Sequence, residues 1–146
     1  MISEIERITE LLKKSFEGEA WHGPSVSEAI KDISEQKALQ KPMHSHSIAG
    51  LVLHMASWRN FVTKKLAGDQ THDVSEQENF PAPTNWASAI SQLNESQKAL
   101  IAALKEFPEE KLTAVVPTRK YDFYTLLHGI IQHDLYHTGQ IMILKK

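Results

Sequence analysis

The segment from residue 122 to residue 144 restricts the possible folds more than any other part of the chain. At 100° per residue, one face of a helix over this segment carries His133, His137 and Gln140, together with Leu126, Ile130 and Leu144. The opposite side carries a second apolar stripe: Tyr124, Leu127, Ile131, Leu135 and Met142. A helix that is apolar on both sides has to be buried on both sides. We therefore expect it at the centre of the fold or against a second copy of the chain.

Three further segments have apolar residues at helical spacing, and they predict long helices near residues 2–17, 47–67 and 84–106. Ser47, Thr84 and Asp122 are candidate N-caps, and Gly68 is a candidate helix end. Ser25 is expected to cap a shorter helix that continues through Ala29, Ile30 and Ile33. Four long helices in one chain favour an all-α fold, a four-helix bundle.

The connections between these helices are polar or contain proline. Residues 34–46 are predicted to form a short turn of helix and a loop, residues 69–83 a loop, and residues 108–121 an extended segment. No set of strands is strong enough to build a sheet. The length of 146 residues predicts a single domain over residues 1–146.

Composition excludes several classes of function. The net charge is −2 with both signs interspersed, so we expect neither a nucleic-acid partner nor an anionic membrane surface. There is no cysteine, which rules out disulfides, thiolate metal ligands and a cysteine nucleophile. The N-terminus is charged and amphipathic, and no apolar run reaches membrane-spanning length. A cytoplasmic location is the expectation that follows.

Histidine is the one residue type in excess, with eight copies. His133 and His137 are four residues apart and lie one above the other on the same helix face. His54 shares an inward face of its own predicted helix with Leu51 and Trp58. Three inward histidines satisfy their ring nitrogens together if they bind one metal ion with an open coordination position. The alternative is that each is a hydrogen-bonded core residue, and the pattern alone leaves both interpretations open.

The neighbouring polar and aromatic residues are expected to have supporting roles. His128 lies about 140° from His133 around the helix, so a packing role is expected for it. Asp134 points about 100° away from the histidine face and is expected to be structural or to support a ligand. Three residues are expected to line a pocket beside the metal, with core packing as the alternative: Trp58 as a wall, Gln140 as a polar orienter, and Tyr136.

These motifs resemble the DinB-like superfamily of metal-binding four-helix bundles, over nearly the whole chain. The most specific match is His133-Asp-Leu-Tyr-His137-Thr-Gly-Gln140-Ile. The segment Ser47-Ile-Ala-Gly-Leu-Val-Leu-His54-Met-Ala-Ser-Trp58 resembles the helix that carries the first metal histidine. The segment that starts Trp21-His-Gly-Pro resembles the stretch after the first helix. The branch with the greatest similarity contains metal-dependent hydrolases and thiol S-transferases.

The resemblance implies a site and a fold but no substrate. It implies that His54, His133 and His137 bind zinc or nickel, in an up-down-down-up bundle that forms homodimers. The main expectation is a metal-dependent hydrolase acting on a small molecule. One alternative is transfer of a low-molecular-weight thiol, which must come from a cosubstrate because the chain has no cysteine. The other alternative is a non-catalytic, stress-related metal-binding protein.

Overall fold

Every regular element of the chain is a helix. The computed structural model describes all residues from Met1 to Lys146. The elements are α1 (Glu4–Glu17), α2 (Val26–Ile30), α3 (Glu35–Leu39), α4 (Ile48–Leu66), α5 (Glu76–Asn79), α6 (Trp86–Glu106), the 3₁₀ turn η1 (Glu109–Lys111) and α7 (Phe123–Leu144). The only β-type pairing is an isolated bridge between Val115 and Asp122. The prediction of an all-α fold is confirmed.

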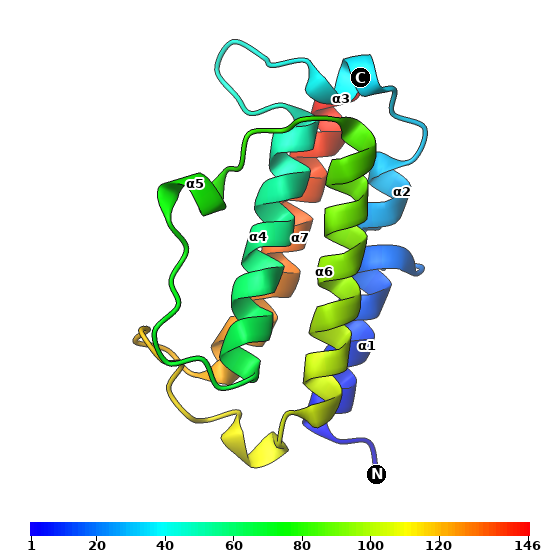
Figure 1. Cartoon of the computed structure of the whole chain (residues 1–146). Helices are drawn as coiled ribbons and strands as arrows, with labels where there is room; N and C mark the ends of the chain where they lie inside the picture. The colour runs from blue at the N-terminus through cyan, green and yellow to red at the C-terminus, as the bar shows by residue number, and fades with distance from the viewer.

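The four long helices, α1, α4, α6 and α7, lie side by side (Figure 1). Each packs against two others: α4 contacts α6 and α7, and α1 contacts the same two helices. The connection from α4 to α6 carries α5 and returns along the outside of α4 (Figure 1). None of the helices combines the length and apolar character needed to cross a membrane.

Most of the predicted helix ends lie where their capping residues indicated. The Ser47 hydroxyl accepts a hydrogen bond from the Gly50 amide at 3.0 Å and starts α4. The Asp122 carboxylate accepts one from the Thr125 amide at 2.8 Å and starts α7. Gly68, just beyond α4, has a φ of 100°, a left-handed conformation that costs glycine little. These caps fix the two helices that carry the predicted metal ligands.

Two helix starts differ from the prediction by one or two residues. The third long helix is capped by Asn85 and not by Thr84, because the Asn85 side chain accepts from the Ser88 amide at 2.7 Å. The first helix begins at Glu4, because Ser3 and the residue three positions later form a capping box. In both cases a neighbouring residue offers the better-placed cap oxygen.

Three shorter segments also differ from their predictions. The helix capped by Ser25 ends at Ile30 and does not include Ile33, because Asp32 has a φ of 61° and turns the chain away. The segment 69–83 is not only loop, since it contains α5, capped by Ser75. The segment 108–121 contains η1 before its short bridge to α7, so it is not extended throughout.

Two apolar clusters fill the bundle, one toward each end. The first joins α2 and the N-terminal halves of α4 and α6 to the end of α7, and the second joins α1 to the opposite ends of the same long helices. Between them the long helices contribute polar residues to the interior. Arg59 of α4, Gln97 of α6 and Asp134 of α7 are all buried there.

Arg59 is the centre of this polar layer. Its guanidinium is fully buried and forms an ion pair with the fully buried Asp134 carboxylate. Its Nε donates to the Gln97 side-chain carbonyl at 3.0 Å. The guanidinium carbon also lies 4.8 Å from the centre of the Phe16 ring of α1. One side chain therefore contacts all three of the other long helices.

The second apolar stripe of α7 is partly covered within the chain. Helices α1 and α2 both pack against α7. Leu127 is buried, Ile131, Leu135 and Met142 are half-buried, and Tyr124 is exposed. Packing within one chain thus buries much of the second apolar stripe of α7, which the sequence predicted to be covered. Dimerisation stays a prediction.

We predict that Asp134→Ala destabilises the protein by about 3–5 kcal/mol, because it leaves the Arg59 guanidinium buried without a counter-charge. The double variant Arg59→Met with Asp134→Leu should lose much less, because both charges are removed and the volume is kept. Urea unfolding of the three proteins measures the difference. A loss below about 1 kcal/mol for Asp134→Ala would contradict a structural role for the ion pair.

Candidate metal centre

The three predicted metal histidines lie together in the structure. His54 comes from α4, and His133 and His137 come from successive turns of α7. The Nε2 atom of His133 lies 2.9 Å from Nε2 of His54 and 3.1 Å from Nε2 of His137. One nitrogen from each ring therefore belongs to a single cluster, in which the potential ligand atoms all lie within 4.8 Å of one another.

The outer ring nitrogens decide which nitrogen carries the proton. The Nδ1 atom of His54 lies 2.7 Å from the backbone carbonyl of Asn79. The Nδ1 atom of His137 lies 2.6 Å from the side-chain carbonyl of Gln140. A carbonyl oxygen only accepts, so each Nδ1 must donate and each Nε2 keeps its lone pair. The Nδ1 atom of His133 is buried and has no partner.

The inward arrangement fits a divalent cation. The Nε2 lone pairs of His54 and His137 both face Nε2 of His133, which can donate a proton to only one of them. At least one pair of facing lone pairs therefore remains, and a cation between them would remove the repulsion. Nitrogen ligands at roughly 2.0–2.1 Å from a tetrahedral zinc ion lie about 3.3 Å apart. The two observed separations, 2.9 and 3.1 Å, are close to that value. The donor set, the tautomers and the spacing are thus all compatible with metal binding.

Burial keeps these histidines neutral. It lowers the pKa of His54 and of His137, while their hydrogen bonds to Asn79 and Gln140 act in the opposite direction. For His133, burial and then repulsion from the other two imidazoles and from the Arg59 guanidinium lower the pKa to about 3. A neutral imidazole is the form that binds a metal. The site is therefore ready for a cation at neutral pH without losing protons first.

Residues 72–80 of the α4–α6 connection, here called the strap, cover the His54 side of the site. The Phe80 ring stacks on the His54 ring at 4.0 Å, and the His46 ring stacks on Phe80 at 3.7 Å. Asn79 contacts two residues of α4, since its backbone carbonyl accepts from His54 and its side-chain oxygen accepts from Trp58 Nε1 at 2.8 Å. The strap thus fixes the orientation of both side chains.

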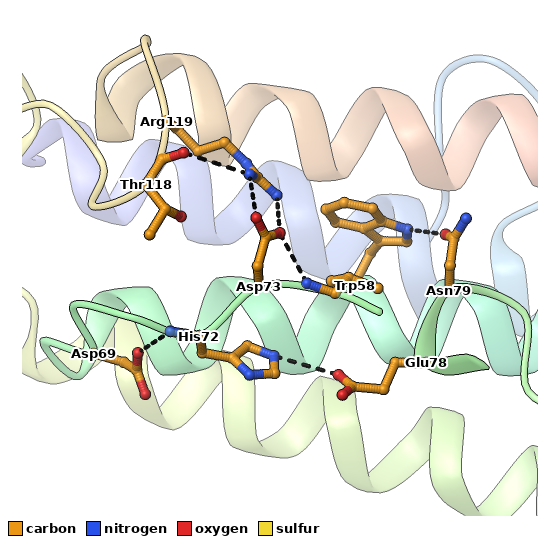
Figure 2. Close-up of polar contacts among 9 residues, drawn as sticks. Trp58, Asp69, His72, Asp73, Glu78, Asn79, Thr118 and Arg119 are labelled. Atoms are coloured by element: carbon orange, nitrogen blue, oxygen red, sulfur yellow. Dashed lines mark hydrogen bonds and ion pairs between the residues drawn. The ribbon is translucent and has the colours of Figure 1, made fainter. Parts of the chain in front are cut away.

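The strap is itself held by an ion pair between Arg119 and Asp73, which Figure 2 shows together with the Trp58–Asn79 hydrogen bond. The Arg119 guanidinium binds both carboxylate oxygens of Asp73, at 2.6 and 3.0 Å, and so ties the strap to the segment before α7. This contact lowers the pKa of the Asp73 carboxyl. His72 approaches Glu78 at 3.5 Å within the strap. The strap is therefore anchored near each of its ends, by Asp73 at one end and by Asn79 at the other.

The three residues predicted to line a pocket do not all lie at the same cavity. Trp58 and His133 line a cavity of about 270 Å³. Gln140 and Tyr136 are not among its lining residues. Gln140 instead accepts a hydrogen bond from Nδ1 of His137 and so orients that ring. Tyr136 is 67% exposed, with its ring edge-on to His137 at 5.0 Å.

The remaining histidines stay outside the cluster. His128 bonds through Nδ1 to the backbone carbonyl of Tyr124 at 2.9 Å. His22 lies 3.1 Å from the backbone carbonyl of Pro24. Asp134, next to His133 in sequence, faces Arg59 and supports the helix rather than the imidazoles. No carboxylate belongs to the group of potential ligands.

Sequence reasoning missed Arg59, Asn79 and Phe80. For Arg59 the signal was a basic residue in the middle of an apolar helix, with an acidic residue, Asp134, in the middle of α7. For the strap it was Ser75 followed three residues later by Glu78, a helix-start pattern inside the expected loop. Neither pattern predicts which side chain of another segment these residues contact.

One comparison with known proteins identifies a family for this chain. The model of the DinB superfamily matches residues 20–141. This range contains all three histidines and the whole strap. Searches of curated proteins and of solved structures gave no match.

The low pKa of His133 predicts a stability change in acid. The pKa falls from 6.5 in an ordinary histidine to about 3 here, so between these pH values the unfolded chain binds a proton that the folded chain does not. Stability therefore decreases as the pH falls below about 6.5. In metal-free protein, the free energy of unfolding of wild type minus that of His133→Gln should shrink from pH 7 to about pH 4. Urea unfolding at each pH measures it, and a constant difference would contradict the buried neutral state.

Proposed function

The chain is a member of the DinB superfamily, and from that premise we propose that it binds one divalent metal ion through Nε2 of His54, His133 and His137. The observation that supports this most strongly is the convergence of three imidazole nitrogens whose outer partners leave at least two lone pairs directed inward. Imidazole ligands suit zinc and nickel, the two metals that we propose. Ligand distances of roughly 2.0–2.2 Å are expected.

We further propose that the site is catalytic and hydrolyses a small molecule. Three neutral ligands leave at least one coordination position for water or substrate, the pattern of catalytic rather than structural sites. A bound ion would supply Lewis acidity, which polarises a substrate oxygen and favours deprotonation of a ligand at neutral pH. The chain supplies the rest: Asn79 and Gln140 hold two imidazoles in place, and the Phe80 strap limits water on one side.

Transfer of a low-molecular-weight thiol to an electrophile is the second candidate. It is favoured by the lack of any carboxylate in the ligand group, which therefore offers no acidic general base of its own. A thiol that loses its proton on binding a cation needs less help from such a base than water does. The thiol has to be a cosubstrate, because the chain has no cysteine.

Metal binding is tested by titrating metal-free protein with zinc and nickel in a calorimeter. We expect one ion per chain, and His137→Ala should weaken binding by more than the roughly 10–100-fold that loss of an outer partner costs. His128→Ala is the matched control, because this histidine lies on the same helix and bonds only to a backbone carbonyl. Equal affinity in wild type and His137→Ala would refute the ligand assignment.

Turnover separates the two reactions from a non-catalytic site. Metal-loaded protein is assayed on ester, amide and phosphoester substrates, and on thiols paired with electrophiles. We expect hydrolysis that chelation abolishes and added metal restores. Thiol-dependent product alone would favour the transferase. No turnover on either panel at full metal occupancy would favour the non-catalytic alternative.

A further inference from the structure

A cavity of about 270 Å³ lies directly beside the three-histidine cluster, between α4 and the first half of α7. Trp58 and Val62 of α4 form one side, and Leu126, Ile130 and His133 of α7 form the other. His133 thus belongs both to the cavity wall and to the cluster. A molecule in the cavity lies against one of the proposed metal ligands.

The surface that lines the cavity is almost entirely apolar. Val62, Leu126 and Ile130 are buried members of the second apolar cluster. Trp58 has only one polar atom, and its Nε1 donates to the Asn79 side chain at 2.8 Å, in the strap (Figure 2). That hydrogen bond leaves the indole with only apolar surface to offer a ligand. Such a wall binds apolar groups by removing their surface from water.

Gly129 keeps the cavity open. It lies in the middle of α7, where glycine costs about 1 kcal/mol relative to alanine. A Cβ atom added there would meet no other heavy atom within 4 Å, so no close packing requires glycine at this position. Its only visible consequence is the empty volume that it borders.

We infer that this cavity receives an apolar group, of the size of one substituted aromatic ring, from the molecule that reaches the metal centre. A cavity of roughly 150 Å³ accommodates benzene, so the larger volume here holds a ring and a short substituent. The aromatic face of Trp58 gives such a ring a favourable neighbour. The link between this group and the metal rests on the proposed function, whereas occupancy of the cavity does not.

Ethylbenzene is the probe, added to uniformly ¹⁵N-labelled protein with and without zinc. The amide signal of Gly129 and the indole signal of Trp58 should shift and saturate in both forms, while glycerol at the same concentration shifts neither. If neither the Gly129 signal nor the Trp58 signal shows a saturable shift, the inference is overturned.

Gly129→Leu fills the cavity and should weaken ethylbenzene binding at least tenfold, as followed at the Trp58 indole signal. Gly139→Leu is the matched control, because Gly139 is an exposed glycine of the same helix whose Cβ would also meet nothing within 4 Å. Both changes raise helix propensity, and circular dichroism verifies that both variants fold. Unchanged binding in Gly129→Leu, or an equal loss in both variants, would place the ligand elsewhere and overturn the inference.

The zinc titration separates the two proposals. Ethylbenzene binding without metal binding would refute the proposed function and leave the cavity assignment intact. Metal binding without ethylbenzene binding would do the reverse. If both hold, Gly129→Leu should raise KM for substrates with an aromatic group more than for substrates without one, at unchanged zinc affinity.

Discussion

The buried ion pair between Arg59 and Asp134 constrains the structure more than any other contact. Two charges removed from water cost several kcal/mol each unless they meet with good geometry. Here they meet in the polar layer between two apolar clusters, and Arg59 also binds Gln97 of α6. Apolar clusters alone tolerate a shift of one helix along another, whereas this pair does not. The ion pair therefore fixes the axial register of α4 against α7, and the Gln97 hydrogen bond fixes that of α4 against α6.

The metal centre depends on the same register. His54 precedes Arg59 by five residues on α4, and Asp134 lies between His133 and His137 on α7. A slip of one turn between these helices would displace facing side chains by about 5.4 Å. That shift exceeds the 2.9 Å between the Nε2 atoms of His54 and His133. A contact with no ligand role thus determines whether the imidazoles can share an ion.

Local sequence signals predicted the long helices and the shared face of His133 and His137, but not the side chains that hold them in place. Ser47 and Asp122 act within one turn of the chain, and so does the spacing of His133 and His137, so the sequence shows them directly. Asn79 and Phe80 contact His54 across about 25 residues of chain, and Arg59 meets Asp134 across 75. Helical periodicity states which side of a helix is inward and says nothing about which residue lies opposite. Thr84 and Asn85 are both good caps, and only the observed backbone selects the second.

Charge and polarity around the centre suggest how a substrate would lie. The charges of Arg59 and Asp134 cancel, and the three histidines are neutral, so the site itself offers a cation no net negative charge. A divalent ion held there would keep its full charge and would favour an anionic or strongly polar group at its open position. The cavity on the other side of His133 presents apolar side chains. A molecule that fits both the open position on the ion and the apolar cavity has a polar reacting group at one end and an apolar ring at the other.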